Sequence, residues 1–236
     1  MQINVGANDI DGIRLTPMPG SNIPGQVRFD SDGQANLAAV HIYLNAQDAG
    51  PNSGAADSAV KPNGAFTLED VGRGNYVPNV QGVPEGFYLK SIRFGDREVL
   101  DSGLDLSNGG GGTLDVVLGA GGGSIEGLVT GPKQAAAPGA TVVLIPEQSR
   151  REQRYRYKTA TADQAGKFKL TGIAPGDYKV FAWEELESGA YLDPEFMKPV
   201  EERGQPFSIK ENAHESVQLK LIPAGDNGPT ASQAQP

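Results

Sequence analysis

The sequence contains no cysteine, only two histidines and one tryptophan among its 236 residues. Without cysteine, disulfides, thiolate nucleophiles and Cys-ligated metal sites are excluded. His41 and His214 cannot form a metal site by themselves. No stretch approaches the ~20 consecutive apolar residues of a transmembrane helix. The first five residues, Met-Gln-Ile-Asn-Val, also lack the basic and apolar regions of a signal peptide.

Positive charge is scarce, since 20 Lys and Arg face 29 Asp and Glu for a net charge of −9. This balance argues against nucleic acid as a main partner, because neutralising phosphates requires a basic surface. The sequence has no Gly-x-Ser-x-Gly elbow, and the glycine-rich stretch 121–124 lacks the lysine of a phosphate-binding loop. We expect no catalytic residues, no metal site and no cofactor.

Glycine (32) and proline (17) are frequent, and long apolar-periodic segments are few, which favours many short strands over helices. Residues 64–76 return as residues 166–178, shifted by 102 positions without a gap. Both copies contain Gly-x-Phe-x-Leu, a glycine-containing turn and Gly-x-Tyr. Alternating Phe and Leu are typical of a half-buried strand, so each copy predicts strand, tight turn, strand.

The repeat extends over about a hundred residues in each copy. Residues 23–27 match 125–129 at the same shift, and residues 39–44 and 113–118 match 140–145 and 216–221 with one residue of slippage. The sequence therefore predicts two β-sandwich units, 23–118 and 124–225, joined by a flexible glycine-rich hinge at 119–123. Residues 1–22 are interpreted as the closing strand region of a preceding unit. The polar tail 226–236 is predicted to be disordered.

Alternation and turn residues predict the individual strands. In the first unit we expect strands at 26–29, 40–44, 66–68, 76–80, 87–94, 98–104 and 113–118, with a surface loop at 45–57. In the second we expect strands at 125–129, 141–145, 155–161, 168–170, 178–183, 206–209 and 216–222. Residues 184–202 form a long acidic connection in which a helical turn is expected.

The run G-x-F-x-L-x-x-[IV]-x-x-G-x-Y, preceded by I-x-G-x-V and a Gly-Ala-Thr-Val strand, resembles the carboxypeptidase regulatory-like domain. That resemblance implies prealbumin-like (transthyretin-like), antiparallel Greek-key β-sandwiches, related to Cna protein B-type repeats and starch-binding-like folds. Such domains are usually non-catalytic modules of exported and envelope proteins. The promoting glutamate of Cna isopeptide bonds would fall at Val80 and Ala182, so we expect no such bond.

Aromatic residues near the end of the repeat suggest a ligand site. Alternation over 178–183 places Tyr178 on the core face and Phe181 and Trp183 on the outer face. With Tyr191, these outward rings could stack on a sugar or receive a protein partner. The favoured alternative is that the connection 184–202 folds back over them.

The charged clusters have simpler interpretations. The acidic residues between 184 and 195 favour a solvated surface over a Ca²⁺ site, and Asp30-Ser31-Asp32-Gly33 is better explained as a hairpin turn. The basic run 150–158 could contact nucleic acid or an acidic surface, but guarding an edge strand is the stronger interpretation.

Two functions remain compatible with the sequence. One is a non-enzymatic structural or assembly module of an extracellular or cell-envelope protein, with neighbouring domains as partners. The other is a carbohydrate-binding module that binds polysaccharide through Trp183, Phe181 and Tyr191. Exposure of Trp183 distinguishes them.

Overall fold

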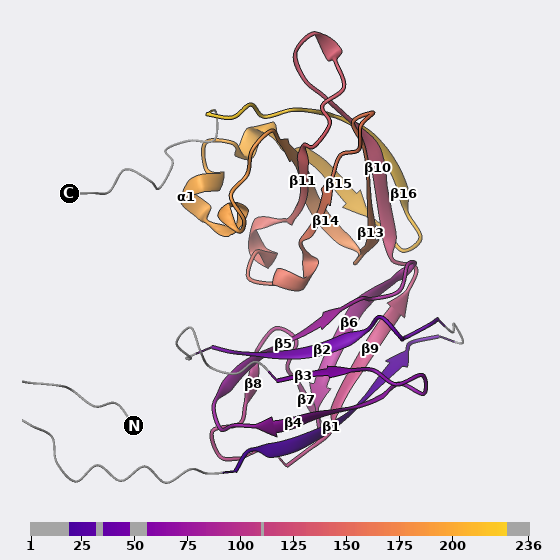
Figure 1. The fold of residues 1–236 in the computed structure, drawn as a ribbon, viewed down its shortest axis with the longest axis vertical. Helices are drawn as coiled ribbons and strands as arrows, with labels where there is room; N and C mark the ends of the chain where they lie inside the picture. Colours follow the sequence, from indigo (N-terminus) through magenta and orange to yellow (C-terminus); the bar gives the residue numbers. More distant parts are fainter. Residues whose placement is uncertain (1–18, 32–34, 48–55, 110, 226–236) are drawn as a thin grey trace, which may run out of the picture.

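The computed structural model describes residues 19–31, 35–47, 56–109 and 111–225. These residues fold as two β-sandwiches stacked end to end along the long axis of the molecule (Figure 1). The all-β prediction is confirmed. The interpretation of residues 1–22 lies outside the described ranges up to residue 18, whereas residues 21 and 22 belong to the opening strand of the first unit, and the interpretation of residues 226–236 also lies outside the described ranges.

The described residues of the first sandwich form nine strands in two sheets. They are β1 (Ser21–Phe29), β2 (His41–Ala46), β3 (Ala56–Ala59), β4 (Ala65–Val71), β5 (Asn75–Gln81), β6 (Phe87–Phe94), β7 (Arg97–Glu98), β8 (Leu104–Asp105) and β9 (Leu114–Ala120). One sheet has the order β4-β1-β9-β6-β7 and the other β3-β2-β5-β8. Their inward side chains form one apolar core.

The second sandwich repeats this plan with seven strands. They are β10 (Gly123–Thr130), β11 (Thr141–Pro146), β12 (Lys158–Thr161), β13 (Lys167–Ile173), β14 (Gly176–Trp183), β15 (Gln205–Ile209) and β16 (His214–Lys220). The sheets are β13-β10-β16 and β12-β11-β14-β15. Strands β6 and β7 have no counterpart here. Residues 184–204 occupy the same place in the chain and contain α1 (Pro194–Met197) between two short 3₁₀ turns.

The duplication is visible in individual contacts. In both opening strands the register shifts at the same place, between Ser21 and Ile23 in β1 and between Gly123 and Ile125 in β10. The repeated tyrosines, Tyr76 and Tyr178, are only 6% and 3% exposed. Tyr178 was predicted to face the core, and both tyrosines do.

In each sandwich the first and last strands run parallel. β1 pairs with β9 and β10 pairs with β16 in parallel register, whereas all other named strand pairs are antiparallel. The prediction of antiparallel sandwiches did not include these two pairs. Because parallel neighbours start at the same end, the chain enters each unit at one end and leaves it at the other.

The connection between the units is shorter than predicted. Gly119 belongs to β9 and Gly123 to β10, so only Gly121 and Gly122 lie between the two strands. The predicted five-residue hinge is therefore wrong, because antiparallel pairing of β9 with β6 up to Ala120 and of β10 with β13 from Gly123 extends both strands almost to their junction.

Three smaller expectations also change. The predicted strand 98–104 is mostly a turn, since the Glu98 carboxylate accepts from Ile92 N and Leu100 N at 3.0 and 3.2 Å. Residues 56 and 57, placed at the end of the loop 45–57, begin β3 (residues 56–59), which runs along β2 and was not predicted. The predicted strand 155–161 begins only at Lys158, after a 3₁₀ turn at Arg154–Arg156.

Candidate interaction surfaces

The predicted aromatic site is buried. Phe181 and Trp183 lie on the outer face of their sheet, as alternation predicts, and their rings stack with centroids 5.2 Å apart. Residues 184–204 fold over them, so Trp183 is 0% and Phe181 1% exposed. We call this segment the cap. Its buried side chains Met197 and Val200 complete a second apolar cluster, so the connection folds back over the two rings as the favoured interpretation predicted, and they are not exposed as a ligand site would require.

Tyr191, the third predicted residue, lies in the cap itself. It is half-buried, and its ring centroid is 5.9 Å from that of Tyr157. A ring must be exposed to stack on a sugar. The arrangement therefore offers no aromatic platform of the predicted kind.

Ion pairs at the end of the cap attach it to the sheet. Arg151 Nη2 donates to both oxygens of Glu201 at 2.9 and 2.7 Å, and Lys179 Nζ lies 2.9 Å from Glu201 Oε1. Burial alone would raise the pKa of Glu201, but hydrogen bonds from Arg151 and Lys179 and their charges lower it. The Glu201 carboxylate therefore stays ionised between the two cations.

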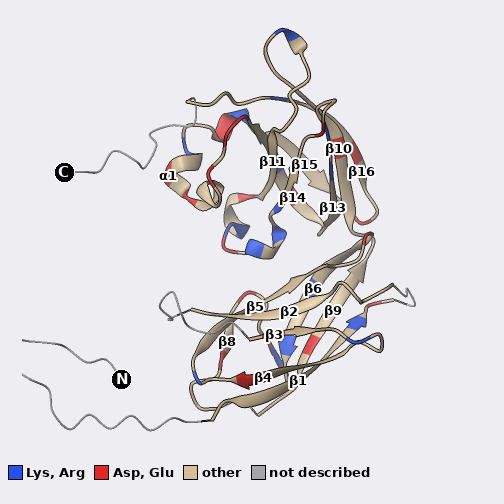
Figure 2. Ribbon diagram, viewed as in Figure 1, with Lys and Arg blue, Asp and Glu red and all other residues tan. Residues whose placement is uncertain are grey.

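Residues of the basic run before β12 make contacts within the molecule. Arg151 contacts the cap, and Arg156 Nη1 donates to Pro175 O and to Tyr178 Oη, both at 3.2 Å. Tyr155 packs against the core of the first sandwich. Figure 2 shows these cations on the side of the second unit that faces the first. The predicted use as an edge guard applies only to Lys158, which begins the edge strand β12.

The junction between the units is bonded on both sides of the two-residue connection. Gly122 N donates to Gly86 O in the first unit at 2.9 Å, and Asn212 N of the second unit donates to Gly121 O at 2.7 Å. A Cβ on Gly172 would lie 2.8 Å from Phe87 O, so a glycine there lets the two backbones approach.

Side chains add further contacts across the junction. Lys169 Nζ pairs with Glu85 Oε1 at 2.6 Å, and Gln153 Nε2 donates to Asp101 Oδ2 at 3.0 Å. The chain thus passes from one unit to the next through a connection that is short and held in place by contacts on several sides. Sequence reasoning missed this junction because its partners are far apart in the chain.

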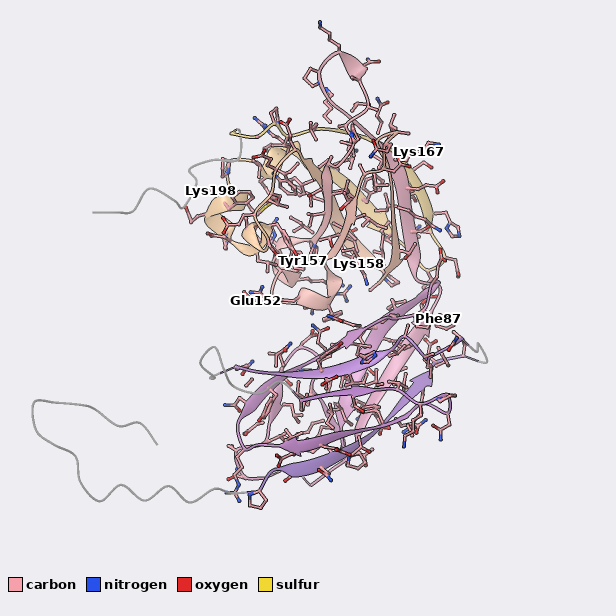
Figure 3. All side chains as sticks on the ribbon, viewed as in Figure 1. Phe87, Glu152, Tyr157, Lys158, Lys167 and Lys198 are labelled. Atoms are coloured by element: carbon pink, nitrogen blue, oxygen red, sulfur yellow. The ribbon has the colours of Figure 1, made fainter. Side chains whose placement is uncertain are left out.

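Lys158 lies at this junction without a countercharge. Figure 3 shows Lys158 and Tyr157 on the side of the second unit nearest the first, and Phe87 at the adjoining end of β6. Burial lowers the pKa of the Lys158 amine. Among the described residues no carboxylate pairs with it, so its charge opposes docking of the two units.

A serine and a histidine also meet beside the junction. Ser124 Oγ and His214 Nδ1 are 2.7 Å apart, in a hollow of about 240 Å³. His214 is exposed, and within the described part of the chain no carboxylate hydrogen-bonds its ring to orient it as a general base. The contact therefore has the features of a surface hydrogen bond that ties β10 to β16.

Two further observations bear on function. In the described ranges no group of three or more His, Asp or Glu side chains is arranged to hold a metal ion. No helix in the same part of the chain is both long and apolar enough to cross a bilayer.

Comparison with solved structures returns the following proteins at low similarity. The TIE protein of Bacillus anthracis is 13% identical, with 86% of this chain and 33% of that chain covered and a TM-score of 0.31. A streptococcal ancillary pilin is 14% identical (85% and 62% covered, TM-score 0.32). The minor pilin of Streptococcus agalactiae is 11% identical (91% and 100% covered, TM-score 0.29). The chain spans a third of the first protein and less than two thirds of the second.

These similarities are too low to carry a functional argument, and no curated protein matches the sequence significantly. The family comparison is more specific. The model of the carboxypeptidase regulatory-like domain matches residues 124–187, which run from β10 into the start of the cap. Over this part of its sequence the second sandwich, whose plan the first one repeats, is similar to the carboxypeptidase regulatory-like domain family.

Proposed function

We propose that the chain is a non-enzymatic spacer or assembly module of an exported or cell-envelope protein. Units 23–118 and 124–225 are its two domains, and its partners are neighbouring domains or proteins. The observation that carries this proposal is the parallel pairing of the first and last strands in each unit, β1 with β9 and β10 with β16.

Parallel first and last strands suit a spacer for a geometric reason. Each unit receives the chain at one end and releases it at the opposite end, so two units in series add their lengths. The junction then keeps the two long axes in line, because Gly121 and Gly122 are bonded to both units and Tyr155 packs across. A two-residue connection with these contacts permits far less reorientation than a flexible linker of glycine and serine.

The buried aromatics support the same function. Tyr76 and Tyr178 hold the cores, and Phe181 and Trp183 hold the cap. Because these rings contribute to internal packing, the described surface lacks the exposed aromatic platform on which the carbohydrate-binding alternative depends.

Distance measurement between two spin labels tests the spacer proposal directly. The chain has no cysteine, so one cysteine introduced at the exposed Arg97 and another at Glu187 place a single label on each unit. We expect one narrow distance distribution. Replacing Tyr155 and Lys169 together by Ala should broaden it, whereas Lys167→Ala should leave it narrow. Lys167 is a matched control because it lies on the same strand, β13, and makes no junction contact in the described residues.

A broad distribution in the unsubstituted chain would show that the units reorient freely, and the spacer proposal would fail. A distribution that stays narrow after the double substitution would instead show that the junction side chains do not hold the orientation.

A further inference from the structure

Strand β16 has one neighbour, whereas its counterpart in the first sandwich has two. β9 lies between β1 and β6, but β16 pairs only with β10 among the described strands. Figure 1 shows β16 beside β10 at the margin of the second unit. An edge strand of this kind directs alternate backbone N–H and C=O groups to solvent.

The difference arises because the segments inserted at the same place in the two units fold differently. Between β5 and β8 the first unit inserts β6, which pairs antiparallel with β9. Between β14 and β15 the second unit inserts the cap, which covers the outer face of the other sheet. The cap cannot serve both places, so the edge of β16 remains uncovered.

Apolar residues beside this edge are correspondingly less buried than their counterparts. Leu114 and Val217 both oppose the glycine of the opening strand, Gly25 or Gly127. Leu114 is fully buried, but Val217 is only partly buried.

Two further positions show the same difference. Leu104 and Phe207 both oppose the repeated tyrosine, and Leu104 is 1% exposed while Phe207 is partly buried. Leu118 is 0% exposed, but Leu221, its counterpart, is also only partly buried. At three repeated core positions the side chain is therefore more exposed in the second unit, where no strand equivalent to β6 covers it.

A hollow marks the place of a missing aromatic pair. In the first unit Phe29 of β1 and Phe87 of β6 have ring centroids 4.8 Å apart. At the repeat distance of 102 residues, Gly131 stands where Phe29 would be. Gly131 and Leu221 line a hollow of about 550 Å³ at this corner.

From these observations we infer that the free edge of β16 is an acceptor for an antiparallel strand from another protein chain. β16 pairs with β10 over seven consecutive residues without a bulge, so its free edge is regular. Its centre, residues 216–219, carries no charge, and the charged residues Glu215 and Lys220 flank it. Edge strands that are protected against pairing are usually short, bulged or charged at the centre.

The structure also specifies the chemistry of the incoming strand. It alternates apolar and polar residues, as β6 does, so that apolar side chains cover Val217, Leu221 and Phe207. An aromatic residue near its beginning fills the hollow beside Gly131, at the place of Phe87 in the first unit. This inference deepens the proposed assembly function by naming one surface through which the module joins a neighbour.

Disulfide trapping with a β6 peptide tests the acceptor edge and its register. Arg93 of β6 opposes Asp115 of β9. Gln218 is the counterpart of Asp115, because Asp115 opposes Gln26, Gln218 opposes Leu128, and Gln26 and Leu128 lie at equivalent positions of the repeat. The probe is a synthetic peptide of residues 85–96 with Arg93→Cys, mixed with the full chain carrying Gln218→Cys. Opposed positions on paired strands place their Cβ atoms within disulfide reach.

We expect this pair to form its disulfide on the order of tenfold faster than the same chain with an Ile92→Cys peptide, because pairing raises the local thiol concentration. The Ile92 position faces the other side of the strand. The chain with Asp115→Cys is the matched control, since β6 already occupies that edge, and it should show no acceleration.

Equal rates with the two peptides, or equal acceleration at Asp115→Cys, would overturn the inference. Rapid disulfide dimerisation of the Gln218→Cys chain without peptide would assign the edge to a second copy of the chain and also overturn it. These rates do not depend on how the two units are oriented. Failure here and failure of the spin-label experiment are therefore separate results.

Discussion

The hydroxyl of Tyr178 donates a hydrogen bond to the carbonyl oxygen of Ala174 over 2.7 Å. Tyr76 makes the same bond to Gly72 over 2.9 Å in the first sandwich. In both units the bond spans four residues and closes the turn between two strands that belong to opposite sheets. The second copy has an additional donor, because Arg156 Nη1 lies 3.2 Å from Tyr178 Oη.

Removing these hydroxyls should destabilise both units, and the second more. Tyr178→Phe leaves the Ala174 carbonyl without its hydroxyl donor and removes one hydrogen bond of the Arg156 guanidinium, which keeps Pro175 O, so we expect a loss of about 1–2 kcal/mol in the free energy of unfolding. Tyr76→Phe should lose about 1 kcal/mol. Denaturant titration followed by circular dichroism measures both. Tyr43→Phe is the control, because Tyr43 lies half-buried on the outer face of its sheet and should change stability little.

Lys158 should make stability depend on pH above neutrality. A lysine whose folded-state pKa is lowered penalises the folded state while it is charged, and the penalty disappears as pH rises toward the ordinary value of 10.5. Stability should therefore rise from neutral pH until the tyrosines begin to ionise near about pH 10. Lys158→Met should raise stability at neutral pH by about 1 kcal/mol and abolish this rise. A parallel pH dependence in the two proteins would contradict the assignment.

Trp183, the only tryptophan, reports on the cap. Its burial predicts fluorescence at short wavelength and little quenching by acrylamide. Met197→Ala removes a buried side chain with which the cap packs on the sheet, so we expect a loss of about 2–4 kcal/mol and easier quenching. Glu187→Ala, at an exposed position in the same segment, is the control. Strong quenching of the unsubstituted protein would show that the cap does not cover the ring in solution.

Glu201 should link the cap to acid stability. Its lowered pKa means that its contribution is present above the ordinary value of 4.5 and is lost as pH falls through the lower folded-state pKa. Glu201→Gln should therefore cost about 1–2 kcal/mol at neutral pH and weaken the loss of stability below about pH 4.5. Comparison with Glu202→Gln, its exposed neighbour, isolates the effect of the ion pairs.

Local patterns in the sequence predicted the fold class and the repeat. Alternation of Phe and Leu and the Gly-x-Tyr turn identify strands that the structure contains, since these signals depend on neighbouring residues. The parallel pairing of β10 with β16 could not be predicted in this way, because it joins segments about ninety residues apart. The same limit applies to β3, whose residues 56–59 have little β-forming character and pair because β2 lies beside them.

The candidate site shows a different limit. Alternation correctly placed Phe181 and Trp183 on the outer face of the sheet, but a strand pattern does not report what lies over that face. The aromatic and apolar residues of the cap, Tyr191, Phe196, Met197 and Val200, were the available signal. The uncovered edge of β16 could be recognised only by comparing the two folded copies.

Among the strands that are equivalent in the two units, the segment between the fifth and the sixth can be replaced, because it folds differently in the two copies. In one copy it supplies a strand that closes a sheet edge, and in the other a compact lobe that shields a sheet face. Among the described residues, the second copy thereby leaves bare the sheet edge that the first copy has closed. A duplicated domain can therefore acquire a new contact surface by changing this single segment, while the packing that holds its two sheets together is preserved.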